Sequence, residues 1–193
     1  MLFYGCKDNS DPCAGHPSLT YRYYLSDSNK AKIPYSNAGF DTLIYISNTN
    51  DTAILYGQGK LQYWVSYSQP NSGPDCGNHD YWYYENIEYN FKSTNVDLNK
   101  INFHVYFHDP IPGGFTTPQP PGRSDLMILT CNGSTEIGGT NFTDANSISY
   151  YTKNILINGQ LYNGIETENN CVYNYKYGIL QFQLNGKTWT KKL

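Results

Sequence analysis

Residues 155–162 read Ile-Leu-Ile-Asn-Gly-Gln-Leu-Tyr, and residues 179–189 read Ile-Leu-Gln-Phe-Gln-Leu-Asn-Gly-Lys-Thr-Trp. In both stretches an Asn-Gly pair separates two short apolar or alternating runs. Asn-Gly accepts the positive φ angles of a type I′ turn, whose twist matches that of two antiparallel strands. We therefore expect two hairpins here, with Leu180, Phe182 or Leu184 close to Trp189 across the second. Two such hairpins in close succession predict a C-terminal β-meander.

Short apolar or alternating runs, separated by turn residues, continue through the rest of the chain. Many short strands at close spacing are typical of an antiparallel β-sandwich or barrel, so we predict an all-β fold with residues 19–193 as one domain. Two loops rich in Pro and Gly are expected at Gln69–Asp80 and Asp109–Ser124. The expected strands are Leu19–Leu25, Phe40–Ser47, Thr52–Gln58, Leu61–Tyr67, Tyr81–Lys92, Ile101–His108, Asp125–Cys131, Ser147–Ile157, Gln160–Glu166, Cys171–Tyr175, Gly178–Leu184 and Lys187–Thr190.

The composition supports strands and argues against several classes of partner. Aromatic residues make up 16% of the chain and charged residues 15%, with 20 tyrosines, and tyrosine favours pleated surfaces. The net charge is −3 and the longest basic run is Lys191-Lys192, so nucleic-acid binding is not expected. No apolar stretch approaches the roughly 20 residues that a transmembrane helix needs.

The N-terminus, Met1-Leu2-Phe3-Tyr4-Gly5-Cys6, resembles the end of a bacterial lipoprotein signal. In that family a peptidase cuts before the cysteine, whose sulfur carries a diacylglycerol. The resemblance implies that Cys6 is lipidated, that the upstream part of the signal is missing from this sequence, and that the protein is exported and held at a membrane. Residues 1–18 are then a lipobox remnant and a flexible tether, since the residues after Cys6 are polar and turn-forming.

Five cysteines are present, and an odd number in an exported protein needs an explanation. Acylation of Cys6 leaves four, which is enough for two disulfides. The candidates are Cys13, Cys76, Cys131 and Cys171, whose three possible connectivities remain open. Buried free thiols are the alternative. None of the cysteines has the C-x-x-C spacing of a zinc ribbon or a redox site.

The C-terminal region resembles the ends of small, uncharacterised lipoproteins of the Bacteroidota. Those proteins share an Ile-x-Ile-Asn-Gly-x-x-Tyr hairpin, a tyrosine-rich strand, a Tyr-Gly-Ile-Leu-x-Phe strand and a short strand with tryptophan. The matching segments are Ile155–Tyr162, Tyr173–Tyr175, Tyr177–Phe182 and Thr188-Trp189. The Lys7-Asp8 pair is similar to the sorting signal of their surface-exposed members. The resemblance implies a place at the outer membrane or the cell surface and gives no activity.

Exposed aromatic rings are the candidate binding site. Two expected strands carry clustered aromatic residues, at Tyr63, Trp64, Tyr67, Tyr81, Trp82 and Tyr84. Rings stack on sugar faces and nearby asparagines supply hydrogen bonds, although the same rings could instead fill the core. Because side chains alternate along a strand, Trp82 and Tyr84 should face away from Tyr81.

No metal, cofactor or catalytic site is predicted. His104 and His108 share one face of an expected strand, but four residues of strand separate their side chains by about 13 Å, which is too far for one ion. Glu85 and Glu88 should lie on opposite faces, and no nucleophile motif is present.

Two functions follow from these observations. The first is a non-enzymatic, lipid-anchored protein of the cell envelope, with a structural role or an envelope-protein partner. The second is an accessory lipoprotein that binds carbohydrate or another ligand through exposed aromatic residues. A continuous aromatic strip on the folded surface would favour the second.

Overall fold

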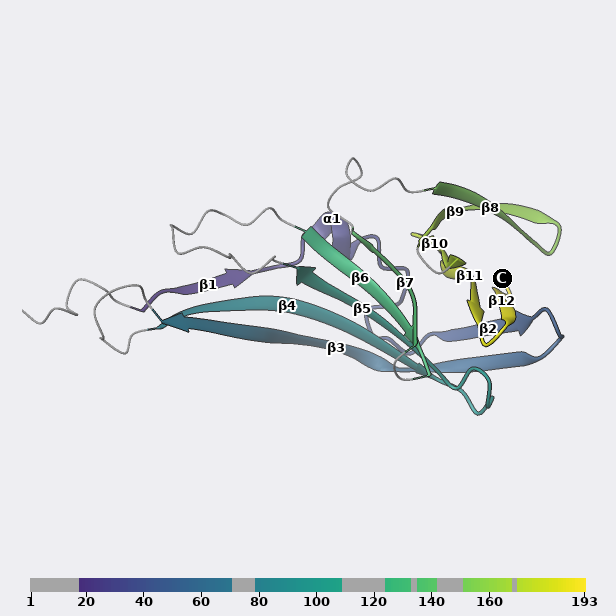
Figure 1. The fold of residues 1–193 in the computed structure, drawn as a ribbon, viewed down its shortest axis with the longest axis horizontal. Helices are drawn as coiled ribbons and strands as arrows, with labels where there is room; N and C mark the ends of the chain where they lie inside the picture. The colour runs from purple at the N-terminus through teal and green to yellow at the C-terminus, as the bar shows by residue number, and fades with distance from the viewer. Residues whose placement is uncertain (1–17, 71–78, 109–123, 133–134, 142–150, 168–169) are drawn as a thin grey trace, which may run out of the picture.

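A computed structural model describes residues 18–70, 79–108, 124–132, 135–141, 151–167 and 170–193. These residues form one 12-stranded sheet and one short helix (Figure 1). The elements are β1 (Thr20–Tyr23), α1 (Asp27–Lys30), β2 (Thr42–Ser47), β3 (Thr52–Pro70), β4 (His79–Lys92), β5 (Lys100–His108), β6 (Ser124–Cys131), β7 (Thr135–Asn141), β8 (Tyr151–Ile157), β9 (Gln160–Glu166), β10 (Val172–Asn174), β11 (Gly178–Leu184) and β12 (Lys187–Lys191). α1 is four residues long, and the described residues contain no helix long and apolar enough to cross a bilayer.

The sheet runs in the order β7-β6-β5-β4-β3-β2-β12-β11-β10-β9-β8, and every pair along this path is antiparallel. Its two halves turn toward each other, since Phe103 of β5 stacks on Tyr173 of β10 with ring centroids 5.8 Å apart. The antiparallel all-β prediction, with β8 to β12 as a C-terminal meander, is confirmed. The single sheet is open, and it encloses the core by curving.

Both Asn-Gly hairpins have the predicted turns. Asn158 and Gly159 have φ angles of 52° and 80°, and Asn185 and Gly186 have φ angles of 50° and 74°, as a type I′ turn requires. Phe182 lies directly opposite Trp189 in the second hairpin. Of the three candidates named for that position, the register selects Phe182.

Two strands differ from the sequence prediction. The expected strands Thr52–Gln58 and Leu61–Tyr67 are one long strand, β3, whose register with β4 shifts between Gly57 and Lys60. Gly59 has a φ of 101° at this bulge, an angle that a non-glycine residue rarely adopts. β7 was not predicted because its sequence, TEIGGTN, has two glycines and no apolar alternation.

The core lies inside the curve, between β2–β6 and the C-terminal meander. Its centre is made of large side chains that are fully buried, namely Trp189, Tyr45, Tyr173, Phe91, Phe103, Phe182, Leu55, Ile87, Leu98, Ile101, Met127 and Leu129. Tyr35, from the connection between α1 and β2, contacts Tyr89, Phe91 and Phe103. We call this part of the molecule the core end.

The strands β3 and β4 continue beyond the core end. β5 pairs with residues 86–92 of β4, and along residues 81–84 its place is taken by β1, which runs parallel to β4. We call β1, residues 64–70 and residues 79–85 the arm, which Figure 1 shows extending away from the C-terminal meander. The arm is therefore a three-stranded extension of the sheet.

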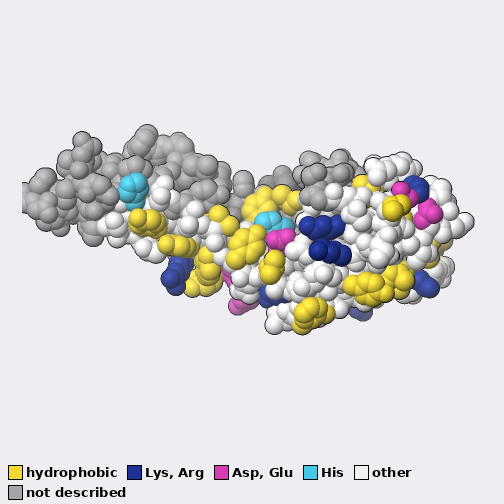
Figure 2. All heavy atoms as spheres, turned by 90° about the horizontal axis from the view of Figure 1, so that it is seen from below, with side chains coloured by type: hydrophobic (Ala, Val, Ile, Leu, Met, Phe, Trp, Pro, Cys, Tyr) yellow, Lys and Arg dark blue, Asp and Glu magenta, His cyan; other side chains and the backbone are white. Residues whose placement is uncertain are grey.

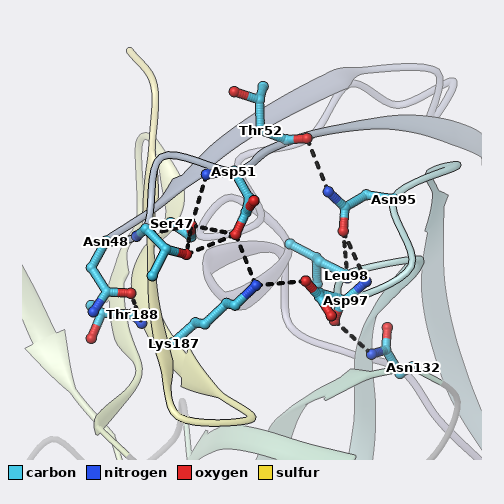
Figure 3. A network of polar contacts seen from close by, with 11 residues as sticks. Ser47, Asn48, Asp51, Thr52, Asn95, Asp97, Leu98, Asn132, Lys187 and Thr188 are labelled. Atoms are coloured by element: carbon cyan, nitrogen blue, oxygen red, sulfur yellow. Dashed lines mark hydrogen bonds and ion pairs between the residues drawn. The ribbon is translucent and has the colours of Figure 1, made fainter.

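A polar network joins three turns at the core end (Figure 3). Lys187, the first residue of β12, contacts Asp51 at 2.8 Å and Asp97 at 2.6 Å. The Asp51 carboxylate also accepts hydrogen bonds from the hydroxyls of Ser47 and Thr49. The network connects the meander to the turns that follow β2 and β4.

Candidate functional site

The arm presents aromatic side chains on both of its faces. We call the face of β3–β5 opposite the core the outer face and the other the inner face. Of the predicted binding residues, Tyr63, Trp82 and Tyr84 lie on the outer face, and Trp64 and Tyr81 lie on the inner face, as the register of β3 with β4 requires. Tyr67 lies opposite Trp82 on β3, although its side chain is outside the described part of the structure. The six residues therefore do not form one platform.

Four rings form pairs on the outer face of the arm. Tyr21 stacks on Trp82 with centroids 5.8 Å apart, and Tyr23 stacks on Tyr84 with centroids 5.3 Å apart. Tyr84 is buried, whereas the other three rings are half-buried. We call these four residues the aromatic ladder. Tyr84 belongs to the cluster of buried core residues, and Tyr23 and Trp82 pack against that cluster, so the ladder is joined to the core.

A polar group lies on the outer face where the arm meets the core end. The Nε2 atom of His104 is 3.0 Å from Oδ1 of Asn86 and 3.4 Å from the hydroxyl of Tyr63. The His104 ring stacks on Tyr63 and contacts Tyr106. With Glu88, which lies opposite His104 on β4, we call these residues the His104 cluster.

The pKa shifts of His104 and Tyr63 indicate which of their atoms carry a proton in the His104 cluster. Burial lowers the pKa of His104, and the nearby Glu88 carboxylate opposes that effect. The imidazole is therefore neutral at neutral pH. Because Nε2 donates its proton to Asn86, Nδ1 is left as an acceptor. Burial and the Glu88 carboxylate, to which the Tyr63 hydroxyl is hydrogen-bonded, both raise the pKa of Tyr63, so this hydroxyl stays protonated and donates to Glu88.

The His104 cluster and the aromatic ladder adjoin on the outer face, where the buried side chains of Tyr84 and Asn86 connect them. Tyr63, Asn86 and Tyr106 lie in one row across β3, β4 and β5, and the next outer-face position along β4 is Tyr84. Figure 2 shows histidine and acidic side chains side by side in the middle of this face, with hydrophobic side chains around them. Along the outer face of β4 the rings of Trp82 and Tyr84 are thus followed by the hydrogen-bonding side chains of Asn86 and Glu88, a combination that binds amphipathic ligands.

The inner face of the arm carries a separate aromatic group. Trp64 is 40% exposed and Tyr81 is 39% exposed. Tyr24 contacts Trp64 edge-on with centroids 5.0 Å apart.

A buried acid lies beside the inner-face rings. Glu85 is 1% exposed, and its carboxylate accepts a hydrogen bond from the Leu25 backbone N–H at 2.9 Å. It also contacts Lys30 at 2.9 Å and the Gln62 amide. Glu85 and Glu88 lie on opposite faces, as predicted. The contacts of Glu85 fasten β1 and α1 to the base of the arm.

The cysteine predictions fall into two groups. Cys6, Cys13 and Cys76 lie outside the described residues, so the lipidation and the disulfides that involve them stay predictions. Cys131 and Cys171 are free thiols in the structure and both are buried in the core. Burial raises the pKa of both thiols, that of Cys171 to about 12. The structure thus presents these two cysteines as small apolar core residues, the alternative that the sequence left open.

No metal centre is found in the described ranges. They contain no group of three or more His, Cys, Asp or Glu side chains that could hold an ion. His104 is bonded to an amide instead, and the His108 side chain is outside the described part.

Sequence reasoning missed the two tyrosines of β1 and the amide of Asn86. Tyr21 and Tyr23 reach the site only because β1 pairs with a strand about 60 residues away, in parallel. The alternation of Tyr21 and Tyr23 within Leu19–Leu25 was the available signal, but it does not indicate which strand β1 pairs with.

Comparisons of the chain with models of known families, with curated proteins and with solved structures gave no match.

Proposed function

We propose that this protein is a non-enzymatic, lipid-anchored protein of the cell envelope that binds carbohydrate on its outer face. The observation that carries the proposal is that the aromatic ladder and the His104 cluster adjoin on the outer face. Stacked ring pairs lie on one side of this junction and hydrogen-bonding side chains on the other. This arrangement favours a ligand-binding role over a purely structural one.

The chemistry of the surface suits a sugar chain. Sugar rings have apolar faces made of C–H groups and edges made of hydroxyls, so they need rings to stack on and both donors and acceptors beside them. Tyr63 is 37% exposed and offers a ring and a hydroxyl oxygen that can accept a hydrogen bond. His104 offers the acceptor Nδ1, and Glu88 offers carboxylate oxygens.

The non-enzymatic part of the proposal rests on the state of the acids nearby. Glu85 is on the inner face, paired with Lys30, and cannot act together with Glu88 across the sheet. Glu88 accepts a hydrogen bond from the Asn90 amide at 2.9 Å. A pair of carboxylates on either side of one glycosidic bond, the usual requirement for glycoside hydrolysis, is not formed by these two residues.

The two faces of the arm provide a matched test of carbohydrate binding. We would measure binding of the Cys6→Ser chain to a glycan array, then compare Tyr63→Ala/Trp82→Ala with Trp64→Ala/Tyr81→Ala. Loss of stacking on the outer face should weaken binding about tenfold or more, since aromatic contacts contribute about 0.5–1.5 kcal/mol each beyond the area they bury. The inner-face variant should bind normally.

The proposal of carbohydrate binding fails if the array shows no bound glycan. It also fails if both double variants lose binding equally while thermal unfolding shows both to be folded.

The lipid anchor is tested separately. The gene with its upstream region would be expressed in a bacterium of the Bacteroidota, and the mature N-terminus would be weighed by mass spectrometry. We expect a mature chain that begins at Cys6 with a diacylglycerol attached, and release of the Cys6→Ser variant from the membrane fraction. An unmodified Cys6 in the soluble fraction would contradict the anchor and leave the binding proposal standing.

A further inference from the structure

A row of three side chains crosses the outer face beyond the His104 cluster. Tyr56 of β3 lies directly opposite Lys92 of β4, and Lys92 lies directly opposite Lys100 of β5. Residues directly opposite each other in a sheet point to the same face. Tyr56 is 58% exposed and Lys92 is exposed as well. One ring and two ammonium groups therefore share one row.

The two lysines have no counter-charge within the described part of the chain. Neither Nζ takes part in an ion pair or a hydrogen bond there, whereas Lys30, Lys153 and Lys187 each contact a carboxylate. Like charges placed directly opposite each other destabilise a strand pair. The nearest acid on the same face of β4 is Glu88, four residues or about 13 Å along the strand.

We propose that the carbohydrate bound on the outer face is acidic, and that one of its carboxylate or sulfate groups lies between Lys92 and Lys100 while its sugar ring stacks on Tyr56. This inference rests on the proposed carbohydrate binding and adds the class of sugar. An anion at this position relieves the repulsion between the lysines and makes charge-assisted hydrogen bonds with both. Figure 2 shows basic side chains gathered beside the histidine and acidic pair on this face.

The spacing along β4 indicates an extended ligand. Trp82 in the aromatic ladder and Lys92 in the basic row are ten residues apart on one strand, or about 33 Å. Between them lie the His104 cluster and the Asn90 and Asn102 side chains, which face each other across β4 and β5. A linear acidic polysaccharide that follows β4 can contact all of these groups at once. The net charge of the chain is −3, so attraction of such a ligand depends on this local pair.

The test compares one polymer with and without its charge. The Cys6→Ser chain would be titrated with polygalacturonate and with its methyl-esterified form, and chondroitin sulfate would be the sulfated probe. The variants are Lys92→Met/Lys100→Met and, as a loss of one positive charge elsewhere, Lys176→Met in the turn before β11. Methionine keeps the apolar stem of the side chain, and thermal unfolding checks that each variant is folded.

We expect an acidic polymer to bind about tenfold more tightly than the esterified form, as one charge-assisted hydrogen bond of about 1.5 kcal/mol predicts. Lys92→Met/Lys100→Met should abolish that difference, and Lys176→Met should keep it. Added salt should weaken only the binding that depends on the lysines.

Four results would overturn the inference. Equal binding of the charged and esterified polymers removes the anionic site, as does unchanged acidic-polymer binding by Lys92→Met/Lys100→Met; both leave the carbohydrate proposal intact. Binding of neutral glycans on the array, with none of the acidic probes bound, has the same consequence. Absence of binding to every glycan overturns the proposed function and this inference together.

Discussion

The core end and the arm are built from the same two strands, β3 and β4, yet they use their aromatic residues differently. The three tryptophans show the difference. Trp189 is fully buried at the core end, Trp64 is 40% exposed on the arm, and Trp82 is half-buried in the aromatic ladder. At the core end the C-terminal meander covers the inner face. The arm extends beyond this cover, so Trp64 and Tyr81 are exposed on its inner face, while the ladder rings of the outer face are buried or half-buried.

This contrast shows that aromatic alternation does not by itself specify a core. Along β4 the inner-face residues Ile87, Tyr89 and Phe91 are buried because β10 to β12 lie across from them. Tyr81 continues the same alternation and is exposed, because the strand has passed the end of the meander. Position relative to a covering element therefore decides whether a ring is structural or available to a ligand.

The largest expected difference between the two regions is in their tolerance of tryptophan loss. Trp189→Ala should lower the free energy of unfolding by about 3–5 kcal/mol, since it removes a large side chain packed on all sides. Trp64→Ala should cost about 1 kcal/mol or less. Denaturant unfolding followed by circular dichroism measures both. Similar losses in the two variants would show that the arm is part of the core.

The next effect concerns the junction between the regions. Glu85→Ala should lower the free energy of unfolding by about 2 kcal/mol, because it leaves the buried Leu25 N–H and Gln62 amide without their acceptor. Glu88→Ala, on the outer face, should cost about 0.5 kcal/mol or less. Hydrogen exchange should show faster exchange in β1 for Glu85→Ala only. Unchanged protection of β1 would contradict the fastening role of Glu85.

A smaller effect comes from a half-buried lysine at the core end, Lys191. Burial lowers the pKa of Lys191 from 10.5 to about 8, while its Nζ donates to the Tyr177 carbonyl. Between pH 8 and 10.5 the unfolded chain holds this proton and the folded chain does not, so stability rises with pH in that window. Lys191→Met should be about 1 kcal/mol more stable than the parent at pH 7.

The measurement for Lys191 is the difference in unfolding free energy between parent and variant, because titration of the many tyrosines is common to both chains. The stability advantage of Lys191→Met should shrink as the pH rises toward 10.5. An advantage that stays constant with pH would exclude the titration of Lys191 as its cause.

The smallest effect is expected from the exposed network of Figure 3. Hydrogen bonds from Lys187, Thr49 and Ser47 lower the pKa of Asp51 from 3.8 to about 2. Because the folded pKa is the lower one, this stabilisation is complete above about pH 4 and is lost as the pH falls toward 2. Lys187→Met should reduce that acid dependence at low salt. Since exposed pairs are screened, an undiminished effect in 1 M salt would contradict this origin.

Much of the fold was predictable because its signals are local. Asn158-Gly159 and Asn185-Gly186 determine their turns through backbone angles that few other residue pairs adopt. β9 and β11 have the predicted bounds because alternation and turn residues coincide at their ends. β7 lacked such signals, and the bulge that joins the two expected strands into β3 depends on Gly59, which equally resembles a turn.

The site was only partly predictable because it depends on pairings between distant strands. The sequence indicated Tyr63 and Trp82, since both belong to runs of aromatic residues. It placed Trp64 and Tyr81 in the same candidate group as Tyr63 and Trp82. The register of β3 with β4, which assigns these residues to the inner or the outer face, cannot be derived from the sequence runs alone. The row of Tyr56, Lys92 and Lys100 comes from three strands whose alignment only the folded sheet defines.

The parallel pairing of β1 with β4 has a mechanical consequence. Thr20 lies opposite Tyr81 and Tyr23 lies opposite Tyr84, so the described chain begins at the free tip of the arm and runs back toward the core end. A pull on Ser18 along the arm loads the pairs of β1 in shear, and they must break together. The hydrogen bonds that join Leu19 to Asp80 and Tyr81 lie at the point of load. Any tension applied from the N-terminal side is therefore carried by the strand that also supplies half of the aromatic ladder.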